Sequence, residues 1–265
     1  MWDSGFYIFL LHLLMKSRRF RTAPDIHRVF NALRLPMLWD IGNGGRVPGI
    51  EAFCMLLFFC TRPRSYEDMS LVFGRSPSMI SWILHVAFTF VYHRGKSILF
   101  WDSDRLTIRK LREYARAISE KVGQNVPLQG IVGFIDGTFR ECARPTHNQQ
   151  ADYNGWKHSH GTKYQGVMAP DGMFVHLGGP FRATWHDCKI LRQSHLEATL
   201  DLAVGRHHGF RLYGDAAYGS RFPWVVASLK RSQLTSPELR RQNIRMASAR
   251  VVVEWGFGRV VKYVL

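Results

Sequence analysis

Two short apolar runs in the second half of the chain each end on an aspartate. Asp136 closes Ile131–Ile135 and Asp215 closes Phe210–Gly214, and both runs have the length and side chains of buried strands. A third acid, Glu254, lies in a later helix-like stretch that is flanked by basic residues. Three carboxylates that share a partly buried pocket repel one another, and a hard cation such as Mg²⁺ removes that repulsion. The pattern therefore predicts an α/β fold in which strand ends and one helix form a divalent-metal site.

Basic residues outnumber acidic ones throughout the sequence. The 265 residues carry a formal net charge of +16, and residues 1–129 and 130–265 each hold 18 Lys and Arg against 10 Asp and Glu. An excess that is spread over both halves favours a polyanion running across the whole molecule, such as nucleic acid. A basic protein without a nucleic-acid role has the same charge, so charge alone leaves both interpretations open.

Size and apolar content are those of a globular protein with two domains. At 46% hydrophobic residues the chain can bury a full core. The four cysteines form no C-x-x-C pair and no secreted disulfide pattern, which favours reduced thiols in an intracellular protein. The runs Ala52–Cys60 and Met79–Tyr92 are too short or too interrupted to cross a bilayer, and Phe6–Met15 lacks the features of a signal peptide. We expect a soluble protein with no membrane partner.

The first half of the chain has the pattern of an all-helical domain, which we place at residues 1–122. Residues 24–34 carry apolar side chains on one helical face, and residues 40–49 are rich in turn residues and are expected to form a loop. A helix over 104–122 carries a row of Lys and Arg that suits a solvent-exposed face. Residues 123–129 follow as a linker.

A candidate DNA-recognition motif lies inside this helical domain. Ser65 begins a short helix that Gly74 ends, and Ser76 begins a longer one directly afterwards. A short helix, a tight turn and a longer helix match a helix-turn-helix over about residues 50–95. An ordinary helical bundle has the same signals and is favoured by the pattern alone, because the polar face of the longer helix holds no Lys or Arg.

From residue 130 the pattern changes to strands. The expected strands are Ile131–Phe139, Lys163–Met168, Met173–Leu177, Phe210–Tyr213 and, hardest to place, Val225–Ser228. Helices are expected over 187–202 and 248–261. This order of elements, with acids at the strand ends, is the layout of an RNase H-like domain. Such a domain is a mixed sheet with flanking helices. We place this domain at residues 130–265.

Several short motifs surround the three acids in a fixed order. They are Gly133–Thr138, Tyr153–Lys157, Gly178–Pro180, His186-Asp187, Tyr213–Tyr218 and Arg250–Gly258. This ordered set resembles the DDE nuclease domain of PIF/Harbinger-type transposases and of the nucleases derived from them. The front half extends the resemblance through Leu33–Pro36 and Tyr66–Arg75, so that it covers roughly residues 25–262. One such motif carries little weight, whereas so many in order are specific.

The resemblance implies a metal-dependent DNA endonuclease and strand transferase that cleaves and joins transposon-end DNA. Its catalytic and metal-binding residues would be Asp136, Asp215 and Glu254, holding two Mg²⁺ or Mn²⁺ ions, with Asp136 bridging the pair. Family members act on double-stranded DNA, both transposon ends and target, and work with a separate Myb-like accessory protein. On this basis we expect a homo-oligomer in the nucleus, for which Lys16–Arg21 is only a weak localisation signal.

Basic residues near the acids are the expected nucleic-acid contacts. They are Arg144, Lys157, His160, Lys163 and Arg250. Arg250 and Glu254 are four positions apart and share a helix face, so Arg250 can orient the carboxylate or contact phosphate. His186 and Asp187 are expected to support the metal ligands from outside, although a helix N-cap is the simpler interpretation of Asp187. The histidines and cysteines nearby fit no standard zinc spacing, which favours magnesium.

Two other functions remain open. A domesticated or degenerate copy of the same fold would bind DNA or a partner without cutting it. The chain ends at Leu265, soon after Glu254, where relatives continue with more helix, and this favours a truncated copy of that kind. A phosphodiesterase that acts on RNA or small substrates would use the same core, because the fold alone does not choose the polymer. The long run of motifs makes the DNA endonuclease the favoured interpretation.

Overall fold

The computed structural model describes residues 23–42, 45–61, 65–123, 129–147, 149–219 and 221–264. The chain divides into two units, each with its own packed interior. The sheet unit contains Ser97–Gly258, and the described part of the helical unit consists of residues 23–96, with the gaps given above, and residues 259–264. No helix in the described ranges is both long and apolar enough to cross a membrane.

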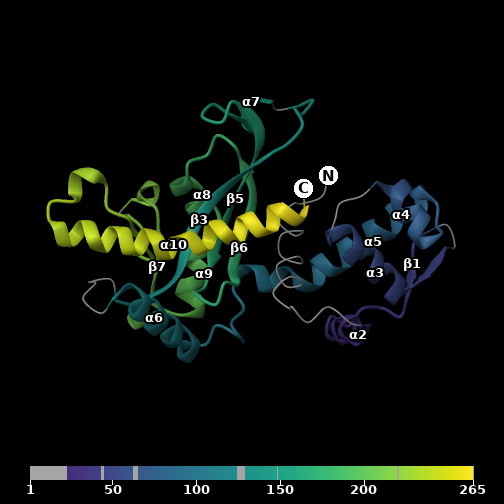
Figure 1. Ribbon diagram of the computed structural model, residues 1–265, viewed down its shortest axis with the longest axis horizontal. Coiled ribbons are helices and arrows are strands. Elements are labelled where there is room, and N and C mark those ends of the chain that lie inside the picture. The colour runs from purple at the N-terminus through teal and green to yellow at the C-terminus, as the bar shows by residue number, and fades with distance from the viewer. Residues whose placement is uncertain are drawn as a thin grey trace. The chain divides into compact units, whose positions relative to one another are not determined.

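The helical unit also contains a short sheet. Its elements, labelled in Figure 1, are α2 (Ala23–Ala32), β1 (Leu38–Asp40), β2 (Arg46–Pro48), α3 (Gly49–Thr61), α4 (Tyr66–Phe73) and α5 (Pro77–Gly95). Strands β1 and β2 pair as an antiparallel hairpin where a loop was predicted over 40–49, so this unit is not all-helical. Trp39 and Val47 face each other in that register, and both are buried. Burial of such a cross-strand pair stabilises two strands that are otherwise very short.

The turn between α4 and α5 has the caps that the sequence predicts. Ser65 caps α4, and Gly74 ends it in the left-handed conformation, with φ at 65°. Ser76 caps α5. Arg75, inside the turn, donates two hydrogen bonds to the carboxylate of Glu51 on α3. Arg75, which lies beside the candidate recognition helix, is therefore already paired within the protein. Base recognition by this segment stays a prediction.

The sheet unit is built on a six-stranded mixed sheet. Its strands are β3 (Ile131–Glu141), β4 (Tyr153–Asn154), β5 (Ser159–Met168), β6 (Phe174–Arg182), β7 (Arg211–Gly214) and β8 (Val225–Ala227). The order across the sheet is β4-β5-β3-β7-β8, and β6 also pairs with β5. Strand β7 runs parallel to β3 and β8, whereas β5 is antiparallel to β3 and β6. A mixed sheet with this strand order fits the expected RNase H-like arrangement.

The sheet unit also contains α-helices and short 3-10 helices. They are η1 (Lys96–Phe100), α6 (Ile108–Val122), α7 (Gln149–Asp152), α8 (Asp187–Gln193), α9 (Leu196–Ala203), η2 (Arg206–His208), η3 (Ala216–Tyr218), η4 (Arg231–Gln233) and α10 (Pro237–Val264). On one face, buried side chains of α6, α8 and α9 form a single core with those of the sheet. Helix α10 crosses the other face (Figure 1), where Phe257 packs on Phe174 and Gly256 lies against Met168.

Helix α6 belongs to the sheet unit, contrary to the predicted domain boundary at 122. It begins after Thr107, whose side chain caps it, and not at residue 104 as predicted. Leu111 and Tyr114 lie in the core under the sheet, and the Tyr114 hydroxyl donates to Asp171 Oδ2 at 2.6 Å. The basic row predicted for this helix covers only its outer face. Its apolar face packs on β3, and the sheet unit therefore begins near Ser97.

The helix predicted over 187–202 is broken in two. His195 has a φ of 55°, a left-handed conformation that few residues other than glycine adopt, and it separates α8 from α9. The break lets each short helix bury a leucine, Leu191 in α8 and Leu196 in α9, against the sheet. The last helix is longer than the predicted range 248–261, because it begins at Pro237.

Candidate active site

Asp136 and Asp215 lie at equivalent positions on neighbouring parallel strands. Phe134 on β3 pairs with Tyr213 on β7, and each aspartate follows two positions later. Because the strands run the same way, both carboxyl groups emerge at the same edge of the sheet, where ligands of open α/β sheets bind. Asp215 also shapes the turn into η3, since its Oδ1 accepts the Ala217 N–H at 2.8 Å.

Arg250 on α10 connects Asp136 with Glu254. Its Nη1 donates to Asp136 Oδ2 at 2.9 Å, and its Nη2 lies 2.9 Å from Glu254 Oε1. The guanidinium therefore spans from its own helix to the sheet. The side chains of Arg250 and Asp136 are 19% and 17% exposed, whereas that of Glu254 is 48% exposed. The ion pairs bring Glu254 on α10 beside Asp136, which lies in the middle of β3 and not at its end as predicted, and Glu254 keeps access to solvent.

These three acids, Asp136, Asp215 and Glu254, are referred to below as the acid cluster. The pKa of Asp136 is raised to about 6, first by burial and also by the negative charges of Asp215 and Glu254. Arg250 is the main opposing influence, and the hydrogen bond from the Gly137 N–H also lowers the pKa. A buried carboxyl group with a pKa near neutrality, held among other acids, is stabilised by any further cation that enters the site.

Asp187 approaches β3 from the other face of the sheet. It is the first residue of α8, and the N-cap is His186, which makes no capping bond with its side chain, so the N-cap interpretation of Asp187 was wrong. The Asp187 Oδ1 lies 4.0 Å from Lys163 Nζ, and a Cβ added to Gly137 would come within 2.9 Å of the same oxygen. Burial raises the pKa of Asp187, and Lys163 opposes the rise. Since Gly137 and Asp136 point to opposite faces, Asp187 lies on the face away from α10.

A buried tyrosine and glutamine lie near these aspartates. The Tyr218 hydroxyl accepts a hydrogen bond from Gln165 Nε2 at 3.3 Å, and both side chains are almost fully buried. Burial raises the pKa of Tyr218, and the charges of Asp187 and Asp136 add to the rise. Tyr218 therefore stays neutral and adds no negative charge to the site. Gln165 Oε1 is buried and has no hydrogen-bond partner among the described residues.

The acid cluster has the ligands that a hard divalent cation prefers. Carboxylate oxygens bind Mg²⁺ and Mn²⁺, and the pKa of Asp136 is raised, first by burial and also by the charges of Asp215 and Glu254. As the side chains stand, no three His, Cys, Asp or Glu in the described part of the chain converge closely enough to hold an ion. The Arg250 guanidinium supplies the positive charge between Asp136 and Glu254 instead. The donor set fits a metal, which would compete with Arg250 for the carboxylates of Asp136 and Glu254.

Three of the five basic residues predicted to contact DNA already have partners within the protein. Lys163 Nζ donates to the Trp185 carbonyl at 2.7 Å, which ties β5 to the segment before α8. Arg144 donates two hydrogen bonds to Gln149 Oε1, at 2.9 and 2.7 Å. Arg250 is paired with the acid cluster. Lys163 is thus placed to position the backbone, whereas Arg144 is exposed and can exchange an amide for a phosphate.

The other two, Lys157 and His160, lie on a hairpin at the edge of the sheet next to α7 (Figure 1), residues 153–160, which we call the hairpin arm. Asn154 is buried in the arm, and its Oδ1 accepts the N–H groups of Trp156 and Lys157, each at 3.0 Å. This turn leaves the Trp156 side chain 88% exposed. Trp156 lies in the motif Tyr153–Lys157 but was not among the predicted DNA contacts, although an Asn-Gly turn directly before an aromatic residue was a signal for an exposed ring.

Comparison with known proteins gives a family match for the second half of the chain. Residues 135–264 match the family described as DDE superfamily endonuclease, and the match includes all three members of the acid cluster. No match was found among the curated proteins or among the solved structures. Over residues 135–264, this chain is therefore similar to the DDE superfamily endonucleases.

Proposed function

We propose that the protein is a divalent-metal-dependent DNA endonuclease and strand transferase of the PIF/Harbinger transposase type. The observation that carries the proposal is the placement of Asp136 and Asp215 at matching positions of two parallel strands, together with the link from Asp136 through Arg250 to Glu254. The family match of residues 135–264 supports a nuclease. The order of short motifs along the chain supports the PIF/Harbinger type.

In this proposal the acid cluster holds two Mg²⁺ or Mn²⁺ ions. Such ions, when bound, activate the attacking oxygen and stabilise the leaving oxygen of a phosphodiester. The protein contributes position: β3 and β7 hold Asp136 and Asp215 on rigid backbone, and α10 presents Glu254 with one side open to solvent. Arg250 offsets part of the negative charge of the cluster without metal, and once released from Asp136 it is the cation best placed to bind the scissile phosphate.

Double-stranded DNA is the substrate that the charge and the exposed side chains favour. The net charge of +16 attracts a polyanion, and the hairpin arm offers an exposed indole beside Lys157. Aromatic side chains stack on bases of any sequence, so this arm suits a general DNA contact. The motif resemblance adds three further proposals: that the protein acts in the nucleus, as a homo-oligomer, and with a Myb-like accessory protein.

A DNA-binding protein that does not cut is the second candidate. The observation that favours it is the Arg250 guanidinium, which already pairs with Asp136 and Glu254 where a nuclease would hold metal. A domesticated or degenerate copy could keep such an internal ion pair, because it would not need to release the carboxylates for a metal. Its DNA affinity would be sensitive to salt and insensitive to divalent cations.

Cleavage of defined DNA separates these candidates. The substrate is a duplex that carries the terminal inverted repeats of the element, incubated with Mg²⁺, with Mn²⁺ or with EDTA. The endonuclease should cut only with metal, and Asp215→Asn should abolish cutting. Asp152→Asn, in α7, makes the same chemical change outside the cluster and should cut normally. Equal cutting by wild type and Asp215→Asn would remove the acid cluster from the mechanism, and binding without cutting by every variant would favour the second candidate.

A further inference from the structure

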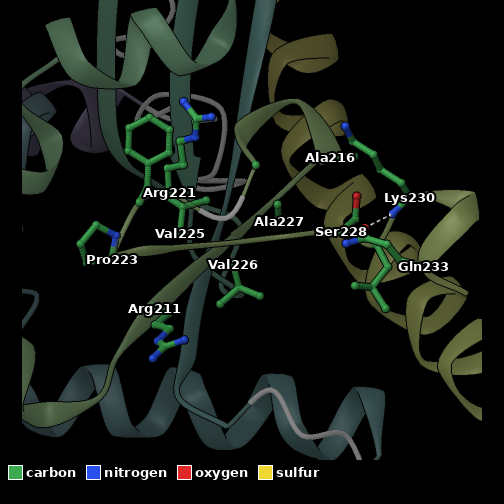
Figure 2. Close-up of a pocket in the computed structure, with 13 residues that line it drawn as sticks. Arg211, Ala216, Arg221, Pro223, Val225, Val226, Ala227, Ser228, Lys230 and Gln233 are labelled. Carbon is green, nitrogen blue, oxygen red and sulfur yellow. Dashed lines mark hydrogen bonds between the residues drawn. The ribbon is translucent and has the colours of Figure 1, made fainter.

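A pocket lies along the free edge of the sheet at β8. It encloses about 560 Å³ and is formed by β8, the loop before it, η3 and η4. Figure 2 shows β8 crossing this pocket, with Arg221 on one side of the strand, Arg211 on the other and Lys230 near its far end. Strand β8 is the last in its sheet, so within the described ranges no further strand covers its outer edge.

The pocket is basic. Arg211, Arg221 and Lys230 line it, and no Asp or Glu does. All three cations are exposed, and in the described part of the chain none of them has an acidic side chain as an ion-pair partner. Pro223 and Val226 add apolar surface between them. Unpaired cations around an apolar wall suit a ligand with anionic and apolar parts, as in the sugar-phosphate backbone of DNA.

Hydrogen bonds hold the end of the pocket that carries Lys230. Gln233 Oε1 accepts the Lys230 N–H at 2.9 Å, the dashed line in Figure 2. Asn243 on α10 accepts the Leu229 N–H at 3.0 Å, and its amide donates back to the Leu229 carbonyl at 3.4 Å. The backbone that presents Lys230 is thus fixed to α10 before any ligand binds, which lowers the entropy lost on binding.

The pocket extends to the edge of the sheet where Asp215 lies. Ala227 on β8 pairs with Gly214, the residue before Asp215, and Ala216, the residue after it, lines the pocket. Arg211 lies at the other end of β7. Four residues of strand span about 13 Å, and successive nucleotides of one DNA strand are about 3.4 Å apart along the duplex axis. The pocket is therefore long enough for a few nucleotides that start beside the acid cluster.

We propose that this pocket binds the backbone of one DNA strand as it leaves the acid cluster. Lys230 binds the phosphate nearest the cluster, Pro223 contacts the sugars, and Arg221 and Arg211 bind phosphates farther along β8. This inference rests on the proposed endonuclease function, because that function places the DNA strand at the acid cluster before it enters the pocket. It adds a substrate site that includes none of the DNA contacts predicted from the sequence. A DNA strand is favoured over a protein strand as the occupant because three cations and no acid line the pocket.

Salt-dependent DNA binding tests the pocket without relying on cleavage. Arg221→Ala, Lys230→Ala and the double variant are compared with wild type in EDTA, by fluorescence anisotropy of a labelled duplex over a range of NaCl concentrations. Each lost phosphate contact should lower the slope of log affinity against log salt by about 1 and weaken binding roughly three- to tenfold. Arg109→Ala on α6, where the side chain is 89% exposed, removes the same charge and should leave the slope unchanged. Thermal unfolding of each variant checks that the fold is intact.

The outcomes separate this proposal from the proposed function. If the pocket variants match Arg109→Ala in slope and affinity, the proposal is overturned, and addition of a protein strand to the edge of β8 becomes the better use of the pocket. A wild-type protein whose DNA binding does not change with salt overturns it as well. If only the endonuclease proposal fails, the wild type binds DNA with the pocket-dependent slope and cuts none.

Discussion

The acid cluster and the hairpin arm belong to one unit, and their side chains are placed in different ways. In the cluster, Asp136 is enclosed and paired: it is 17% exposed and accepts a hydrogen bond from Arg250. In the arm, Trp156 is 88% exposed, and Lys157 is exposed beside it. The arm is nevertheless ordered, because the buried Asn154 fixes its turn.

Because of this difference, we expect the acid cluster to set the rate of cleavage and the hairpin arm to set the affinity for DNA. Groups that a sheet holds at fixed positions can act on reacting atoms, because little motion is needed at the moment of reaction. Exposed groups on an ordered turn gain contacts only when a partner arrives. Substitutions in the acid cluster should therefore change cleavage rate and stability but leave DNA affinity alone. Substitutions in the arm should change affinity alone.

The largest effect should come from Asp136→Asn, which removes one metal ligand. We expect single-turnover cleavage to fall by roughly 10³-fold or more, while DNA affinity in EDTA stays within about twofold of wild type. Quenched-flow cleavage and anisotropy measure the two quantities separately. A parallel loss of affinity would show that the cluster also anchors DNA, and the contrast with the arm would be lost.

The same variant should be more stable than wild type without metal. The folded-state pKa of Asp136 is about 6, above its ordinary value of 3.8, so the folded protein binds more protons than the unfolded one between these values. Its stability therefore falls as pH rises through 6. Removing this charge should add about 1–3 kcal/mol to the free energy of unfolding at pH 8 in EDTA. Urea denaturation measures it, and a loss of stability would mean that the Arg250 pair outweighs the cost of burial.

Arg250→Met should have the next largest effect, on stability. It leaves the enclosed Asp136 carboxylate without its cation, which should cost about 1–3 kcal/mol at pH 8 in EDTA. The cost should shrink at pH 5, because the pKa of Asp136 is already raised to about 6 and rises further without Arg250. Arg250→Lys keeps the charge and serves as the control. A cost that is equal at the two pH values would show that Arg250 acts by packing and not by charge.

Local signals in the sequence were enough to predict the frame of the site. Asp136 and Asp215 ended apolar runs, and strands β3 and β7 lie where those runs are. Ser65 and Ser76 have side chains that cap helices through bonds to nearby backbone, and these were predicted because they depend only on residues a few positions away.

Features that depend on distant contacts were missed. The strand pair around Trp39 is stabilised by packing on Phe90, more than forty positions later, while its own segment is rich in turn residues. The break at His195 needs a left-handed residue that is not glycine, and packing on the sheet imposes it. The hydrogen bond from Arg250 to Asp136 joins residues 114 positions apart, so only the shared helix face with Glu254 was predictable.

Trp156→Ala tests the arm. If the exposed indole stacks on a base, its removal should weaken DNA binding by about 1–2 kcal/mol, or roughly five- to thirtyfold. Stability should not change, because the side chain is 88% exposed. Trp156→Phe keeps an aromatic face and should recover most of the affinity. Trp255 on α10 is 66% exposed, and Trp255→Ala is the matched control. A loss of stability in Trp156→Ala, with affinity unchanged, would contradict a role in binding.

The smallest effect should come from Lys157→Gln, which removes one charge from the arm and keeps most of the side chain. A single exposed phosphate contact should be worth about two- to threefold in affinity at moderate salt, and the slope of log affinity against log salt should fall by about 1. Cleavage at saturating DNA should stay at the wild-type rate, because Lys157 lies on the arm and outside the acid cluster. Anisotropy across a salt series and cleavage at saturating DNA measure these quantities. A slower cleavage step at saturating DNA would mean that the arm also positions the scissile bond, and rate and affinity would then not divide between the two regions.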